Sequence, residues 1–464
     1  MKFKEYPFSE LLSNIVDNRG KTCPVQDVGV PLIATNCIKN ESLYPVFEKV
    51  RYVSMDTYNN WFRGHPKSGD LIFVCKGSPG RVSWVPDPVA FCIAQDMVAI
   101  RADDSKIDPK YLFALLRSKL VQDKILNMHV GTLIPHFKKG DFKNLYLTIH
   151  VDLEWQKKIG LIYFNISKKI ESNVKINQTL EHIAQAIFKS WFVDFDPVKA
   201  KIAALEMGGT QEAAELAAMS VIAGKDEAQL EQLKVKNEHA YQQLAQTAAL
   251  FPAAMEASEL GDIPVGWITL PLYETAEYIN GGSFKMEDFS SDRSGLPIVK
   301  IAELKQGVSE GTKFTTGIFN KRIFIQTDDV LYSWSGSPET SLEVFKWFGG
   351  DGWLNQHIFK LNFLSDEQKY FTYYLLKHLK PVLIETAKQK QTTGLGHITV
   401  ADMKRIKITT PDKAAFLAFG NKVKSLYTQC SLLEKENIVL TNIRDSLIPK
   451  LLTGEVTFSD AEPM

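Results

Sequence analysis

The chain has 464 residues, 45% hydrophobic and 23% charged, which is typical of a folded globular protein with room for two or three domains. Its 54 basic and 54 acidic residues cancel, which argues against a free-standing nucleic-acid binder held by a strong overall positive field. No apolar run is long enough to span a membrane, the N-terminus lacks the apolar core of a signal peptide, and the five cysteines form no CxxC pair. We therefore expect a cytoplasmic protein without disulfides or a zinc site, whose contacts with any nucleic acid depend on local patches or partner subunits.

Residues 1–151 alternate short apolar runs with turn signals, which predicts a compact domain with a small β-sheet. An amphipathic segment at about Pro109–Leu126 predicts one helix among the strands. This mixture indicates an α+β fold. The expected strands are Leu71–Cys75, Val82–Val85, Met97–Arg101 and Leu145–Ile149.

Residues 152–197 predict one long helix with a continuous apolar stripe. Apolar side chains recur there at steps of three and four residues, which is the spacing of one helix face. Because a proline cannot continue a helix, we expect the helix to end at Phe195-Asp196-Pro197. The stripe comprises Ile159, Ile162, Ile166, Ile170, Val174, Leu180, Ile183, Ile187 and Trp191.

Residues 198–258 are rich in Ala, Glu and Gln, unlike the rest of the chain. Gly208-Gly209 and Gly224 interrupt this segment and Pro252 ends it, which predicts two or three helices. No second copy of the segment follows. We interpret it as a helical spacer, and docking of a specific partner is the alternative.

Residues 259–410 repeat the first domain, and residues 411–464 repeat the long helix. Matching residues have numbers that differ by 259 to 261, and several matches in register indicate a tandem duplication. In the repeated apolar stripe only Glu434 breaks the match. The matched pairs include Gly77-Ser78-Pro79 with Gly336-Ser337-Pro338, Lys110-Tyr111 with Lys369-Tyr370, Gln95 with Gln356, His136 with His397, Asp141 with Asp402, and Lys143 with Lys404.

Two long helices with matching stripes bury those stripes best against each other, which predicts an antiparallel coiled-coil pair. The duplication then relates the two halves by a pseudo-two-fold axis, an arrangement suited to two DNA half-sites at a fixed separation.

Asn177 and Asn437 either fix the helix register or are simply exposed, and Trp191 and Leu451 either close the helix interface or face a partner. The residues of this helix seam are Ile166, Asn177, Leu180, Ile183, Ile187, Trp191, Leu426, Asn437, Leu440, Ile443, Leu447 and Leu451.

The sequence contains no Gly-x-Gly-x-x-Gly or Walker loop, no His-Glu-x-x-His and no Gly-x-Ser-x-Gly elbow. Its nine histidines do not cluster at the spacing of metal ligands. We therefore expect no catalytic residue and no metal site, and the pattern favours recognition over catalysis. An internally duplicated helical scaffold or adaptor that does not bind DNA is the alternative, supported by the zero net charge and the Ala-rich segment.

Three motifs resemble conserved regions of one protein family. Ala-Ile-Phe-Lys-Ser-Trp-Phe-Val-Asp-Phe-Asp-Pro at 186–197 and Leu-Thr-Asn-Ile-Arg-Asp-Ser-Leu-Ile-Pro-Lys-Leu-Leu-Thr-Gly-Glu at 440–455 are similar to the central and C-terminal regions of type I restriction–modification specificity subunits. Ile-Pro-Val-Gly-Trp at 263–267 is similar to the opening of their target-recognition domains. The strands at 69–72 and 328–331, each leading into a Gly-Ser loop, also fit.

This resemblance implies a non-catalytic subunit with two tandem target-recognition domains, residues 1–151 and 259–410, each reading half of a split site in double-stranded DNA. It further implies that the long helices bind two modification subunits, which transfer a methyl group from S-adenosylmethionine to adenine N6. Restriction subunits would join the complex for cleavage. The chain itself would bind no cofactor and contact no membrane.

Reading bases requires donors and acceptors that reach the major groove, such as Arg or Lys for guanine and Asn or Gln for adenine. His136 and His397 are either structural histidines or DNA contacts. Each candidate below is weighed against the alternative of an ordinary solvated surface residue. The DNA-binding candidates are Arg19, Lys21, Lys76, Ser78, Arg81, Lys138 and Lys139 in the first domain, and Lys285, Ser335, Ser337, Thr340, Lys388, Lys390 and Gln391 in the second.

Overall fold

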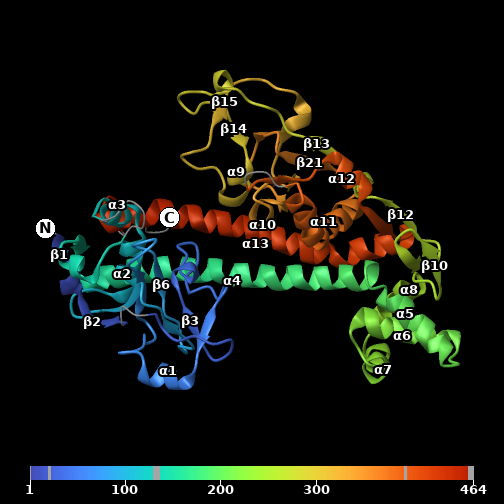
Figure 1. Ribbon diagram of the computed structural model, residues 1–464, viewed down its shortest axis with the longest axis horizontal. Helices are drawn as coiled ribbons and strands as arrows, with labels where there is room; N and C mark the ends of the chain where they lie inside the picture. Colours follow the sequence, from blue (N-terminus) through green and yellow to red (C-terminus); the bar gives the residue numbers. More distant parts are fainter. Residues whose placement is uncertain (1, 19–21, 129–135, 391–393, 458–464) are drawn as a thin grey trace. The chain divides into compact units, whose positions relative to one another are not determined.

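The computed structural model describes residues 2–18, 22–128, 136–390 and 394–457, and Figure 1 traces the elements along the chain. Residues 1–175 with 433–464 form one compact unit, and residues 176–432 form another. Each unit contains one mixed α/β domain and part of both long helices, so its members come from distant parts of the sequence. In the described residues no helix is long and apolar enough to cross a membrane.

The described residues of the first unit form three small sheets. A two-stranded sheet pairs β1 with β9, a four-stranded antiparallel sheet has the order β2-β8-β5-β6, and a three-stranded sheet has the order β4-β3-β7. The four strands predicted from the sequence are confirmed as β5, β6, β8 and β9. The strands are β1 (Phe3–Pro7), β2 (Leu12–Asp17), β3 (Val30–Ile33), β4 (Arg51–Val53), β5 (Leu71–Val74), β6 (Val82–Trp84), β7 (Cys92–Ile93), β8 (Met97–Ala102) and β9 (Tyr146–His150).

The single helix predicted at about Pro109–Leu126 is wrong, because the structure has two helices there, α2 (Pro109–Arg117) and α3 (Lys119–Met128). Ser118 separates them with an extended backbone, and its hydroxyl donates to the Leu115 carbonyl at 2.6 Å. A serine that bonds to nearby backbone competes with helix continuation, which accounts for the break. The apolar face of α2 packs with strands β5 and β8 in the main core of this unit. The short helix α1 spans Met55–Asn60.

The second unit repeats this plan. Its four-stranded sheet has the order β13-β21-β17-β19, which matches β2-β8-β5-β6, and its parallel pair β14–β20 matches β3–β7. The strands are β10 (Met255–Ser258), β11 (Gly261–Pro264), β12 (Ile268–Pro271), β13 (Glu277–Asn280), β14 (Leu296–Val299), β15 (Phe314–Thr315), β16 (Phe324–Ile325), β17 (Val330–Ser333), β18 (Ser335–Gly336), β19 (Glu343–Lys346), β20 (Gly352–Leu354), β21 (Ile358–Asn362), β22 (Gly396–His397) and β23 (Lys407–Thr410). The helices are α9 (Ile301–Gln306), α10 (Pro338–Ser341), α11 (Asp366–Lys388) and α12 (Val400–Arg405).

Individual hydrogen bonds confirm the duplication. Asp70 accepts from the backbone N–H of Lys67 at 2.8 Å through its side chain, and Asp329 accepts from Gln326 at the same distance. The Asp70 carbonyl accepts from Val85 as the Asp329 carbonyl accepts from Trp347, both at 2.9 Å. Because backbone bonds of this kind fix a strand's start, the two domains share local geometry as well as residue types.

The long helices are α4 (Leu153–Phe192) and α13 (Lys413–Thr453). Asp152 and Asp412 cap the starts of these helices, since each carboxylate accepts a backbone N–H of the first turn, from Glu154 at 2.9 Å and from Ala415 at 2.8 Å. Side-chain oxygens placed there stabilise a helix N-terminus. Gly454, with φ of +74°, follows the end of α13 in the left-handed conformation that suits glycine.

The antiparallel pairing of α4 and α13 is confirmed within each unit. In the second unit, Phe188 of α4 packs against Phe419 of α13, with ring centroids 5.8 Å apart. In the first unit, the Asn173 amide donates to Glu436 Oε2 at 2.8 Å and to Asn437 Oδ1 at 2.9 Å, and Asn173 is fully buried. Asn437 is thus a polar contact of the helix pair, with Asn173 as its partner.

The residues predicted for the helix seam differ in how far the structure buries them. Trp191 and Leu451 are buried, while Ile187, Leu426 and Leu447 pack against the cores of their units. Ile183 and Ile443, at matching positions, are 44% and 41% exposed, so they lie outside the buried interface. The remaining seam residues, Ile166, Asn177, Leu180 and Leu440, are half-buried.

The prediction of two or three helices in residues 198–258 is wrong, because the segment contains four: α5 (Asp196–Glu206), α6 (Gln211–Ala223), α7 (Glu227–Lys236) and α8 (Glu238–Ala249). Figure 1 shows them clustered after the end of α4. Lys201 of α5 is only 1% exposed and donates to Glu215 of α6 at 2.8 Å and to the Phe251 carbonyl at 2.7 Å. These bonds tie the cluster together. Asn237 separates α7 from α8 and caps the latter.

Two of the three motifs that resemble the family, 186–197 and 263–267, lie in the core of the second unit. Phe188, Trp191 and Phe192 of the 186–197 motif are buried beside Trp267 of the 263–267 motif. The Trp267 ring lies 5.8 Å from that of Phe192 and 5.7 Å from that of Phe195. Aromatic pairs at these separations stabilise a core beyond their buried area. The two motifs therefore form one packing unit.

Candidate nucleic-acid interface

Each unit presents a glycine-serine loop held by the same backbone pairing. In the first unit, Lys76 forms a bridge with His136, and the N–H of Phe137 donates to the Cys75 carbonyl at 2.8 Å. The bridge holds the loop at 77–80 against the segment that carries Lys138 and Lys139. Gly77 has φ of +85°, a conformation that a side chain disfavours, which accounts for glycine there.

The second unit repeats this arrangement. Ser335 pairs with His397, and the N–H of Ile398 donates to the Trp334 carbonyl at 2.8 Å. Gly336 has φ of +117°. The matching histidines therefore share a backbone role in strand pairing, and whether their side chains contact DNA stays a prediction.

The DNA-binding candidates of the first unit differ in accessibility. Lys76 and Lys138 are exposed, whereas Ser78 and Arg81 are half-buried. Lys139 is exposed and its ammonium lies 3.0 Å from Asp17 Oδ2. The loop pairing brings Lys76, Ser78, Lys138 and Lys139 onto neighbouring segments. Arg19 and Lys21 lie outside the described residues.

Five candidates of the second unit, Ser335, Ser337, Thr340, Lys388 and Lys390, lie around α10 and the end of α11. Ser337 is the N-cap of α10, Thr340 is exposed in that helix, and Lys388 forms a 2.8 Å ion pair with Glu339. Ser335 is half-buried in β18. Lys285 pairs with the nearby Glu287 at 3.6 Å. Gln391 lies outside the described residues.

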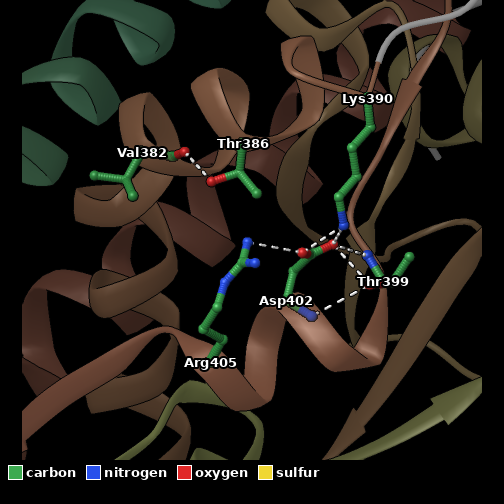
Figure 2. A network of polar contacts seen from close by, with 6 residues as sticks. All are labelled: Val382, Thr386, Lys390, Thr399, Asp402 and Arg405. Atoms are coloured by element: carbon green, nitrogen blue, oxygen red, sulfur yellow. Dashed lines mark hydrogen bonds and ion pairs between the residues drawn. The ribbon is translucent and has the colours of Figure 1, made fainter.

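Lys390 has a structural partner, as Figure 2 shows. Its ammonium lies 2.5 Å and 2.6 Å from the two oxygens of Asp402, which also accept from Thr399 and Arg405. Burial alone would raise the pKa of Asp402, but the hydrogen bonds from Lys390 and Thr399 lower it to about 2. The carboxylate thus stays ionised at neutral pH. The charge of Lys390 is compensated in this network, and a DNA contact through it stays a prediction.

A polar cleft in each unit was missed in the sequence analysis. In the first unit, a cleft of about 460 Å³ lies between strand β2 and residues 63–67, with Arg101 and Lys139 on its wall. In the second unit, a cleft of about 350 Å³ lies between β13 and residues 320–323. Arg63 in one cleft and Arg322 in the other are related by the same 259-residue offset as Asp70 and Asp329. This shared offset is visible in the sequence and could have indicated that the two arginines occupy matching positions.

No group of three or more His, Cys, Asp or Glu residues within the described ranges could hold a metal ion. The features that the two units share are loops, clefts and basic side chains on small sheets. These features are typical of a recognition surface, and each unit has one set of them.

The family model for the type I restriction modification DNA specificity domain matches residues 16–182 and 264–441, which is more than half of the chain. The chain therefore belongs to this family, and its function is DNA sequence recognition as the specificity subunit of a type I restriction–modification system. The matched ranges cover most of the two α/β domains and extend into α4 and α13.

Among individual relatives, the HindI specificity subunit of Haemophilus influenzae is 29% identical over 407 residues, covering 84% of this chain and 87% of that protein. The MjaIX specificity subunit of Methanocaldococcus jannaschii is 22% identical, covering 75% and 69% of the two chains. Among solved structures, the type I S subunit of M. genitalium has a TM-score of 0.51 and 17% identity over 97% of this chain and 96% of that one. This last similarity concerns the fold alone.

Proposed function

We propose that the chain reads a bipartite site in double-stranded DNA, with each α/β domain recognising one half. The observation that carries this proposal is the repeated loop architecture, in which Lys76 pairs with His136 and Ser335 pairs with His397. A duplicated protein that keeps one loop geometry but changes its side chains has two readers of related shape and different specificity. Lysine, serine and arginine at these positions supply donors for bases and phosphates.

Docking of two modification subunits, joined by restriction subunits, is the second part of the proposal. Apolar side chains remain exposed on the long helices of both units. On the first unit's share these include Val174 at 41% and Val439 at 56%, and on the second unit's share Ile183 at 44% and Leu432 at 53%. Exposed apolar side chains repeated along a helix are typical of a protein interface. This supports a partner-facing role for Ile183 and Ile443.

In this proposal the chain carries no catalytic group and binds no cofactor. S-adenosylmethionine is used by the modification subunit, which methylates adenine after that base has been rotated out of the duplex. A cytoplasmic location remains part of the same proposal. The adaptor alternative gains no support from the relatives, which are specificity subunits.

Reconstitution tests the proposal. Purified chain, purified modification subunit and the mixture are each incubated with labelled S-adenosylmethionine and genomic DNA, and methyl incorporation is measured. We expect incorporation only with the mixture, because sequence reading and methyl transfer reside on different chains. Methyl transfer by the isolated chain would contradict the proposal, and so would equal transfer by the modification subunit alone.

A further inference from the structure

The cleft of the first unit has a strong excess of positive charge. Its basic lining residues are Arg63, Lys67, Arg101 and Lys139, and Asp17 is the one acidic residue among the described residues that line it. Burial lowers the pKa of the His65 imidazole, which favours its neutral form, and its ring is stacked on that of Tyr58 with centroids 3.8 Å apart. An open, polar concavity with several cations is a site for an anion.

Two of the four cations are already compensated. Arg101 forms a two-bond contact with Asp70, at 2.8 Å and 3.0 Å, and the Asp70 side chain is 2% exposed. Lys139 pairs with Asp17 at 3.0 Å. In the described part of the chain no carboxylate is ion-paired with Arg63 or Lys67, and both residues are exposed. Their charges are therefore available to a ligand.

The second unit has the corresponding cleft with different chemistry. By strand register, Asn280 takes the place of Asp17 and Glu277 that of Asn14, and Gln326 replaces Lys67. Of the four cations in the first unit's cleft, only Arg63 has a basic counterpart among the described residues that line the second unit's cleft, and that counterpart is Arg322. Its guanidinium donates to Glu277 Oε1 at 2.8 Å, and Glu277 also accepts from Asn362 at 2.9 Å. Arg322 is thus neutralised by an acid that the first unit lacks.

We propose that the first unit's cleft binds a phosphate of the DNA backbone through Arg63 and Lys67, and that Arg322 makes the same contact more weakly because Glu277 competes for it. This inference rests on the proposed DNA-reading function and adds an asymmetry to it. The first domain supplies more of the salt-dependent affinity than the second. Phosphate contacts fix position and carry no sequence information, so these arginines set affinity and not the recognised sequence.

The test uses the complex assembled with its modification subunit. DNA binding is measured by fluorescence anisotropy over a salt series. One duplex contains the sequence that the complex methylates, and the other is an unrelated duplex. We expect Arg63→Gln to weaken binding to both duplexes by the same factor. We also expect log K to fall less steeply with log salt, the steepness decreasing by about 0.9, the value for one phosphate contact. The methylated sequence stays the same. Glu277→Gln releases Arg322, so binding tightens and the slope rises.

Lys225→Gln is the matched control, because it removes one positive charge from an exposed position between α6 and α7. It is expected to leave affinity and slope unchanged. Wild-type slope and affinity in Arg63→Gln would overturn the phosphate site, and unchanged or weaker binding by Glu277→Gln would overturn the assignment of Arg322. Absence of DNA binding by the wild-type complex would instead refute the proposed function. The gain expected for Glu277→Gln cannot arise from misfolding.

Discussion

Phe188→Ala is expected to destabilise the second unit by about 3–5 kcal/mol, the range for removing a buried phenylalanine. Phe188 is 1% exposed, and its ring lies 5.3 Å from that of Phe371 on α11 and 5.8 Å from that of Phe419 on α13. The substitution opens a cavity where α4, α11 and α13 meet. Chemical denaturation of the full chain, followed by tryptophan fluorescence, measures the loss.

Ile183→Ala is the matched control, because Ile183 lies on the same helix but is 44% exposed. A substitution at such a surface position changes the free energy of unfolding by about 0.5 kcal/mol or less. Equal losses for the two variants would contradict the assignment of the buried face of α4. The same control variant has a second use, since weakened assembly with the modification subunit at unchanged stability would support a partner-facing role for Ile183.

Exchange of residues 1–151 for a recognition domain of different specificity is expected to replace one half of the recognised sequence and leave the other half intact. The structure favours these ends, since β1 pairs with β9 and sets Phe3 opposite His150, so the segment starts and finishes on one small sheet. The donor domain must preserve the apolar residues that pack against Ile159 and Leu451 of the long helices. Sequencing of methylated sites in a host carrying the hybrid reads out the result.

The unaltered chain in the same host is the reference for this exchange. A hybrid that methylates new sequences in both halves would contradict independent reading by the two domains. If the donor domain fails to pack against α4, we expect a hybrid that is expressed normally but methylates no site. Chemical denaturation of the hybrid detects such a packing failure separately.

The sequence predicted the duplication well because repeated backbone roles demand repeated residue types. Asp70 and Asp329 cap the same turn, and the glycines at 77 and 336 occupy the left-handed region. Such local requirements are visible in a single chain. Those strands of the first unit that are short or have few strand-favouring residues, such as β4 and β7, gave too weak a periodic signal to be predicted.

The buried face of α4 was predicted less accurately. The apolar stripe included Ile183, whereas the structure buries Ala184 and Phe188 instead. A stripe drawn through large aliphatic residues overlooks alanine, which permits close helix packing because it is small. The break at Ser118 and the extra helices after residue 197 depend on hydrogen bonds to particular neighbours, which spacing alone does not specify.

The candidate DNA contacts show a further limit of sequence reasoning. Lys390 was selected as a surface cation, but only the folded chain brings it to Asp402, whose carboxylate it shares with Arg405. Arg63 was overlooked because its neighbours differ from those of Arg322, although the offset between the two arginines is that of the other matched pairs. Ion pairing across strands decides which cations remain available, and it follows from tertiary contacts.

The most direct test of the central claim is sequencing of adenine methylation in a host genome, with the chain and its modification subunit expressed together and the modification subunit expressed alone as the reference. The account predicts one new methylated motif made of two short specific sequences separated by a spacer of fixed length. A motif that is contiguous, or one that is unchanged when this chain is omitted, would contradict it.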